Sequence, residues 1–273
     1  MKMRTTAAAL ILVALTFQAL PATASTSALK DPTSNFAYNP NPLSSGPCQA
    51  SCPDPCWYVT ATGPKIAPNT NTKSCNAYVL LSTNAARAKE SLRAFSLPSN
   101  FYSLTPAEQM FVVIDEERVS RGLAPYLGLE RSLDQVAASG AKLGTDPRLP
   151  ASIPAGPVGW GSIWAGTYSV LMADFGWMYQ DGWGGSVQNT ANIDCTSPVA
   201  KSCWGHRHVI LSLGTTSGLR CQTCVMGAAY APPTASHSYG NYAAIFMQPA
   251  AATPSLYFTW QNNVKPYLPA KTN

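Results

Sequence analysis

Eight cysteines in two clusters of four constrain the fold of this 273-residue chain more than any other feature of its sequence. The first cluster contains Cys48, Cys52, Cys56 and Cys75, and the second contains Cys195, Cys203, Cys221 and Cys224. An even number of cysteines in an exported chain indicates disulfide bonds. We predict that Cys195 pairs with Cys203 and Cys221 with Cys224, whereas the first cluster allows three pairings.

The first 24 residues predict export. Lys2 and Arg4 give a positive start, residues 7–20 form an apolar run too short to cross a bilayer comfortably, and Ala22-Thr23-Ala24 is a cleavage site of small residues. We expect a signal peptide at residues 1–24 and a secreted, extracellular protein with no membrane span after cleavage. A retained N-terminal anchor is the alternative.

The charge composition argues against nucleic acid as a partner. Cleavage would remove two of the 18 basic residues and none of the 13 acidic ones, so the mature chain would carry a net charge of only +3. Charged residues make up 11% of the chain, against about 25% in average proteins. The surface is therefore expected to be rich in uncharged polar residues, which suits a secreted protein.

Composition divides the rest of the chain into three parts. Residues 25–100 form a Pro-, Ser- and Cys-rich N-terminal extension, with a helix expected near residues 85–92. Residues 101–250 carry enough apolar residues for one sizeable core. Residues 251–273 form a C-terminal tail whose aromatic residues are suited to a last strand.

Two helices open the main domain. Thr105-Pro106-Ala107-Glu108 has the capping-box pattern, with Thr105 as the N-cap, and predicts a helix that ends at Gly122. A second helix is expected over 132–141, with Val136, Ala137 and Gly140 on a small inward face, and Gly144 ends it.

The remaining pattern predicts an α+β fold. Residues 145–166 are interpreted as a crossing segment rich in Pro and Gly, followed by a third helix with an apolar stripe between Tyr168 and Tyr179. Strands are expected at 224–231 and 242–247. Early helices followed by late strands are typical of this class.

Several motifs, taken in order over residues 105–250, resemble CAP (SCP-like) domains, the superfamily of cysteine-rich secretory, antigen 5 and pathogenesis-related proteins, in a bacterial secreted form. The motifs are the helix 111–121 with Gly122-Leu123-Ala124-Pro125, the small-faced helix 132–141, Trp177-Met178, Gly205-His206-Arg207 before Val209-Ile210-Leu211, and Tyr242-Ala243-Ala244-Ile245-Phe246. The resemblance implies an α-β-α sandwich of CAP/SCP type with an open cleft, here with an N-terminal disulfide-stapled extension.

The cleft of that family usually holds two histidines and two acidic residues, and this chain keeps one of the four. His206 matches the second histidine, whereas Ser162 stands in one acidic place and Ser202-Cys203-Trp204 offers no acid before Gly205-His206. Helix 132–144 has no histidine. The resemblance therefore implies a degenerate cleft, and we expect no metal site and no cofactor.

Local chemistry gives His206 three interpretations. Its ring can hydrogen-bond backbone carbonyls and lock a turn, it can line the cleft as a polar group, or it can take part in catalysis. Asp194 is the acid that a Cys195–Cys203 bond could bring back toward His206. His208 is expected to point elsewhere, and His237 lies in a Ser-rich loop.

Other candidates have structural alternatives. Trp160 and Trp204 can line a groove for a sugar or lipid, although aromatic residues are more often core. Cys221 and Cys224 have the spacing of zinc ligands, but export favours a disulfide. Glu117 and Arg118 are expected to join a network that ties their helix to a loop.

The sequence favours a secreted, non-catalytic binding or interaction module. Its predicted binding residues are His206, Trp160, Ser162, Trp204 and Asp194, and its partner is an extracellular ligand such as a lipid or glycan. The main alternative is an extracellular hydrolase of peptides, glycans or esters that uses His206 as a catalytic residue. A purely structural protein of the cell envelope is the third hypothesis.

Overall fold

The computed structural model describes residues 29–36, 57–60, 63–66, 73–185, 191–214, 219, 221, 223–235, 239–250 and 254–270. The predicted signal peptide, His237 and the cysteines Cys48, Cys52 and Cys56 lie outside these residues, as does the side chain of Cys75. None of the helices in the described part of the chain is long and apolar enough to cross a membrane.

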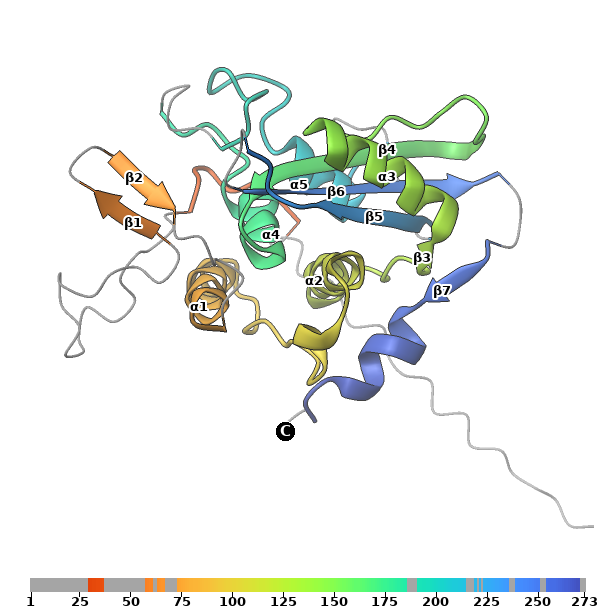
Figure 1. The fold of residues 1–273 in the computed structure, drawn as a ribbon, viewed down its shortest axis with the longest axis horizontal. Coiled ribbons are helices and arrows are strands. Elements are labelled where there is room, and N and C mark those ends of the chain that lie inside the picture. Colours follow the sequence, from red (N-terminus) through yellow and green to blue (C-terminus); the bar gives the residue numbers. More distant parts are fainter. Residues whose placement is uncertain are drawn as a thin grey trace, which may run out of the picture.

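A five-stranded mixed sheet forms the centre of the fold, in the order β4-β6-β5-β3-β7 (Figure 1). Its strands are β3 (Leu129–Glu130), β4 (Ala155–Thr167), β5 (Val225–Ala231), β6 (Gly240–Pro249) and β7 (Leu256–Phe258). β3 and β5 are parallel, and the other neighbouring pairs are antiparallel. A separate hairpin joins β1 (Trp57–Thr60) and β2 (Gly63–Ile66).

Helices cover both faces of this sheet (Figure 1). The α-helices are α1 (Lys73–Lys89), α2 (Pro106–Ser120), α3 (Arg131–Leu143), α4 (Val170–Tyr179) and α5 (Gly205–Leu211). Short helical turns are η1 (Phe101–Ser103), η3 (Trp260–Val264) and η4 (Lys265–Tyr267). The predicted α+β class is confirmed.

Alternation along β6 explains the two-sided packing. Ile245 and Met247 face α3, while Ala244 and Phe246 face the larger core under α2, α4 and α5. Successive strand residues point to opposite faces, so a strand that is covered on both sides is apolar throughout.

α3 lies close to the sheet because Gly227 of β5 has no side chain. A Cβ atom at Gly227 would lie 2.2 Å from the backbone carbon of Leu133. At the other end of α3, a Cβ on Gly140 would lie 2.8 Å from Pro147. The small inward face expected for this helix, with Val136 and Ala137 buried, is confirmed.

The ends of the early helices follow the predicted signals. Thr105 caps α2, and the reciprocal bonds with Glu108 form a capping box. Gly144 ends α3 with a left-handed conformation at φ 66°, which glycine adopts at little cost. Glu130, rather than a residue within 132–141, is the N-cap of α3.

Three boundaries differ from the sequence prediction. The segment 145–166 is not only a crossing, because it contains most of β4. The helix predicted near 85–92 begins at Lys73 and ends at Lys89. α4 starts after Ser169, whose hydroxyl accepts from the backbone of Met172, so Tyr168 precedes the helix.

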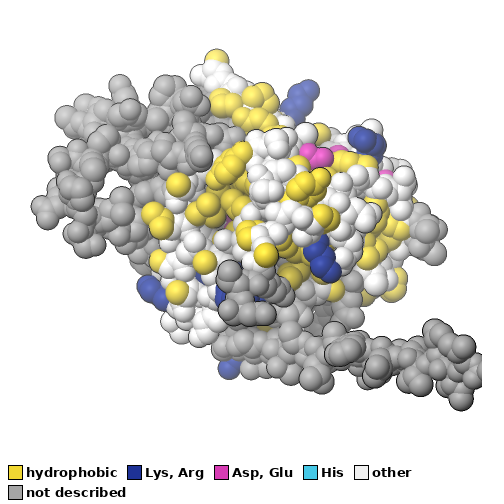
Figure 2. Space-filling view, turned by 90° about the horizontal axis from the view of Figure 1, so that it is seen from below, with side chains coloured by type: hydrophobic (Ala, Val, Ile, Leu, Met, Phe, Trp, Pro, Cys, Tyr) yellow, Lys and Arg dark blue, Asp and Glu magenta, His cyan; other side chains and the backbone are white. Residues whose placement is uncertain are grey.

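The surface carries few charges, as the composition predicts. Figure 2 shows one face, on which apolar side chains lie in small groups between uncharged atoms and only scattered Lys, Arg, Asp and Glu appear. Such scattered apolar residues are normal on a protein surface and indicate no partner by themselves.

Candidate functional site

The start of α5 is organised by Asp181, a buried carboxylate on the segment that follows α4. Its Oδ2 atom accepts the backbone N–H groups of His206 at 2.8 Å and Arg207 at 3.2 Å. The residue before the helix, Trp204, has a left-handed backbone (φ 63°) and provides no side-chain cap. Asp181 therefore satisfies N–H groups that a helix start leaves unpaired.

The same carboxylate holds the imidazole of His206. Asp181 Oδ1 lies 2.6 Å from Nδ1, and Asp146 Oδ1 lies 3.9 Å from Nε2 on the other side of the ring. Burial alone would lower the pKa of His206, but Asp181, helped by Asp146 and Asp194, raises it to about 9. The ring is therefore an imidazolium at neutral pH.

Two adjoining cavities lie beside this ring. The first, about 430 Å³, has a mixed polar and apolar lining. It is lined by Asp146, Trp160, Gly161, Ser162, Asn192, Asp194, Ser202, Gly205, His206 and Val209. Four of the five predicted binding residues, namely His206, Trp160, Ser162 and Asp194, meet here.

Trp204 does not line either cavity. It is buried, and its ring lies so close to Gly182 that a Cβ there would be 2.4 Å from the indole. The Arg207 guanidinium carbon lies 6.0 Å from the centre of the same ring. Trp204 therefore packs beneath the start of α5, against Gly182, and does not line the cleft.

The second cavity, about 640 Å³, shares Asp146, Asn192, Asp194 and His206 with the first and extends between β4 and α4. Its wall is largely aromatic and apolar. That wall includes Trp164, Tyr168, Met172, Phe175 and Trp177. The two cavities together form a cleft with a polar centre and one apolar arm.

Asp194 lines the cleft immediately before the loop between Cys195 and Cys203. The predicted pairs Cys195–Cys203 and Cys221–Cys224 both lie at distances compatible with a disulfide bond. Asn192 precedes this loop: its Nδ2 donates to the backbone oxygen of Ser202 at 3.0 Å, and its Oδ1 accepts from the backbone N–H of Asp194 at 2.9 Å. Asp194 is thus brought to the same cavity as His206, as the stapled loop suggested.

Sequence reasoning missed the two acids nearest to His206. Asp181 and Asp146 lie 25 and 60 positions before it, and neither belongs to a recognisable motif. The interpretation of His206 as a residue that bonds backbone carbonyls is wrong for the ring, because Nδ1 meets a carboxylate. Asp181, not His206, holds the turn at the start of α5, by accepting the backbone N–H groups of His206 and Arg207.

His208 faces away from the cleft, as predicted. Its Nε2 lies 2.7 Å from Oδ1 of Asp31, in the N-terminal strap formed by residues 29–36. Phe36 of this strap donates its backbone N–H to the backbone oxygen of Tyr179 at 2.8 Å. In the part of the chain that the structure describes, no group of three or more His, Cys, Asp or Glu side chains is arranged to hold a metal ion.

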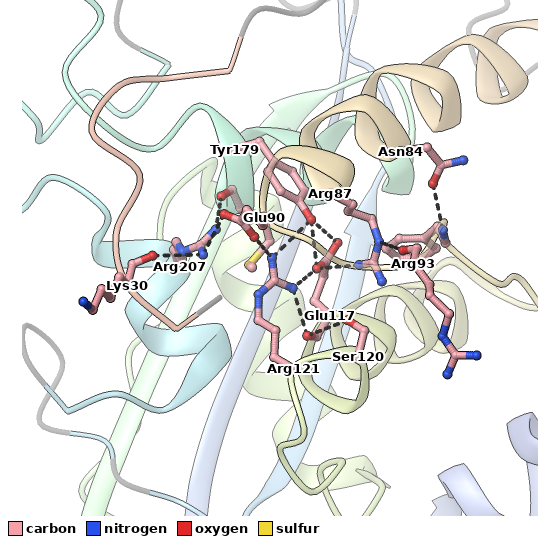
Figure 3. Close-up of polar contacts among 12 residues, drawn as sticks. Lys30, Asn84, Arg87, Glu90, Arg93, Glu117, Ser120, Arg121, Tyr179 and Arg207 are labelled. Atoms are coloured by element: carbon pink, nitrogen blue, oxygen red, sulfur yellow. Dashed lines mark hydrogen bonds and ion pairs between the residues drawn. The ribbon is translucent and has the colours of Figure 1, made fainter. Parts of the chain in front are cut away.

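A buried charge network joins α1, α2, α4 and α5 (Figure 3). Glu117 accepts from Arg87 at 2.7 Å, from Tyr179 at 2.9 Å and from Arg121, so α2 is joined to α1 and α4. Burial alone would raise the pKa of Glu117, but Arg87 and Arg121 hold it below its usual value.

The network reaches α5 through Glu90 and Arg207, and Arg118 makes separate contacts with α5. Arg207 pairs with Glu90 at 2.9 Å and donates to the backbone oxygen of Met178 at the same distance. Arg118 donates to the backbone oxygens of Ile210 at 2.7 Å and Cys221 at 3.2 Å. Arg118 thus ties α2 to loop residues as predicted, whereas Glu117 ties it to the helices α1 and α4.

Comparison with known proteins adds no relative. No family model, curated protein or solved structure matches this chain.

Proposed function

We propose that this chain is a secreted CAP-like domain protein that acts as a non-catalytic binding module, with its ligand held in the cleft around His206. One observation carries the proposal: His206 lies where two cavities meet, with Asp181 fixed on one side of its ring and Asp146 on the other. Helices on both faces of a sheet support the α-β-α sandwich that the motif order implies.

The charge of the ring favours binding over catalysis. A general base must be unprotonated near the working pH, and an imidazole must be neutral to hold a metal. With a pKa of about 9, His206 meets neither condition at pH 7. It can still donate a charge-assisted hydrogen bond from Nε2 to a ligand.

A hydrolase remains the second candidate because of one specific feature. Asp181 orients the imidazole through Nδ1, and Ser162 and Ser202 line the same cavity as its free edge. Among the described residues, however, neither hydroxyl hydrogen-bonds to the ring. A mechanism of this kind would need the neutral imidazole, so its rate would rise as pH passes 9.

The two candidates are separated by one set of measurements on the full chain. Turnover of p-nitrophenyl acetate and labelled casein is followed from pH 6 to 10 for the wild type and His206→Gln. Tryptophan fluorescence follows titration with N-acetylchitotriose and decyl glucoside, because Trp160 and Trp164 line the cleft. The binding proposal predicts saturation with at least one probe and no turnover that depends on His206.

Turnover that rises through pH 9 and disappears in His206→Gln would replace the binding module with the hydrolase. If neither probe saturates, and the amphiphiles described below also fail to bind, the binding proposal is overturned.

A further inference from the structure

We propose that the ligand of this cleft is an organic cation with an apolar body, such as an ammonium group attached to an alkyl or aryl chain. The inference rests on the proposed binding function and names the class of ligand. It combines the shape of the larger cavity with the charges at its mouth.

The larger cavity suits an apolar body. Its volume of about 640 Å³ lies within the roughly 300–1,000 Å³ of small-molecule sites. Trp164 and Met172 are partly exposed there, and the buried residues Phe175 and Trp177 line the cavity from α4. Aromatic faces also attract ammonium groups, most strongly where water is excluded.

The charges at the mouth favour a cation. Three of the chain's 13 acidic residues, Asp146, Asp181 and Asp194, lie around the single imidazolium of His206. Asp181 and Asp146 both face that imidazolium, so three carboxylates share one positive charge in the cleft. The cleft is therefore negative in a chain whose formal net charge is +5, and it repels anions.

Asp194 is free to meet the ligand. Its side chain is exposed, and its carboxylate accepts no hydrogen bond from the described residues. Its backbone is nevertheless fixed, since Asn192 holds its N–H and the Ser202 hydroxyl donates to its carbonyl. A carboxylate on a fixed backbone needs little reorganisation to pair with an incoming cation.

Gly176 offers a direct way to block the apolar arm. It lines the larger cavity from α4, and a Cβ built there meets no atom within 4 Å. Gly176→Leu should therefore fill the cavity without a backbone clash, and replacing a helical glycine also removes its entropic cost. This variant is expected to fold at least as well as the wild type.

The test compares three amphiphiles with one tail and different heads. Decyltrimethylammonium, decyl glucoside and decyl sulfate are titrated below their critical micelle concentrations into the full chain, and binding is measured by calorimetry and tryptophan fluorescence. The cation is expected to bind at least ten times more tightly than the glucoside, and the sulfate more weakly still.

The variants locate the binding and its charge dependence. Gly176→Leu should weaken decyltrimethylammonium at least tenfold while circular dichroism stays unchanged. Asp194→Asn should weaken the cation severalfold and leave decyl glucoside unaffected. Glu130→Gln removes one acid at the end of β3, outside the cleft, and should change neither affinity.

The failures are distinguishable. Tighter binding of the glucoside or sulfate, lost in Gly176→Leu, would overturn the cationic ligand and leave the binding module standing. Equal affinity for all three heads, or an Asp194→Asn variant that binds the cation as the wild type does, would also overturn the cationic class. If no amphiphile binds and N-acetylchitotriose does not saturate, both proposals fall.

Discussion

Asp181 holds His206 at two points: Oδ1 lies 2.6 Å from the ring nitrogen Nδ1, and Oδ2 accepts the backbone N–H at 2.8 Å. One buried carboxylate therefore fixes both the orientation of the ring and the first turn of α5. Any change at Asp181 should alter the cleft and the helix together, whereas a change at the ring alone should spare the helix start.

Because of the Asp181–His206 pair, the folded chain should become less stable at alkaline pH. The pKa of His206 is about 9 in the folded chain and about 6.5 when unfolded. Because the folded value is raised, the contribution is fully present below pH 6.5 and is lost as pH rises through 9. The shift corresponds to about 3 kcal/mol of unfolding free energy, measurable by urea denaturation at pH 6, 8 and 10.

His206→Gln should remove this part of the pH dependence while keeping a polar side chain. Asp181→Asn should remove it as well, and should also cost stability at pH 6 because α5 loses an acceptor. A His206→Gln variant whose stability still falls between pH 6.5 and 9 as in the wild type would show that another group is responsible.

Asp174 should make the stability of the fold depend on pH in the acidic range. It is buried on α4, and neither carboxylate oxygen has a hydrogen-bond partner among the described residues. Burial, and then the charge of Glu117, raise its pKa well above the ordinary value. Its contribution to stability is thus present below about pH 3.8 and is lost as pH rises toward the folded pKa.

Asp174→Asn should therefore gain stability relative to the wild type as pH rises from 4 to 7. Chemical denaturation at both pH values measures the difference. Glu130→Gln, which removes an acid at the end of β3, should show little such change. A difference between Asp174→Asn and the wild type that is the same at both pH values would contradict the prediction.

Replacing Glu117 should cause a large loss of stability. It is fully buried with Arg87 and Arg121, so its removal leaves two guanidinium groups without their shared carboxylate. Breaking a buried pair by removing one partner costs about 3–5 kcal/mol. Glu117→Gln should lower the denaturation midpoint accordingly, and a change below about 1 kcal/mol would mean that water or another acid replaces it.

Removing the N-cap side chain of α2 should cause a smaller loss of stability. Thr105→Ala removes the side chain that accepts from Glu108 N and should cost about 1 kcal/mol. Ser103→Ala, in the preceding turn, is the matched control and should stay within about 0.5 kcal/mol. Equal midpoints for both variants would place the effective start of the helix elsewhere.

Local signals explain which parts of the fold could be predicted. The ends of α2 and α3 are set by capping residues and a C-terminal glycine that lie within a few positions of each end, so the sequence reveals them. Buried apolar runs indicate β5 and β6. β4 was missed because Gly156, Pro157, Gly159 and Gly161 are typical of a loop. It is an edge strand, where proline and glycine are tolerated, and its register shifts between Ala155 and Trp160.

The site was predictable only where its residues share a motif. Ser162 and His206 could be placed by resemblance, and Asp194 by the expected Cys195–Cys203 loop. Asp181 and Asp146 come from separate loops, and only the packing of α4, α3 and α5 brings them to the ring. A lone aspartate beside glycine or proline has no pattern that predicts such a role.

The N-terminal strap has a consequence for the order in which the chain becomes ordered. Asn35 bonds Gly182 across 147 positions, and Asp31 meets His208 across 177. Since a chain is made from its N-terminus, residues 29–36 leave the ribosome long before these partners exist. They must wait, unpaired, until α4 and α5 have been synthesised and packed. The earliest of the described residues to appear thus cannot reach both partners until residue 208 has been made.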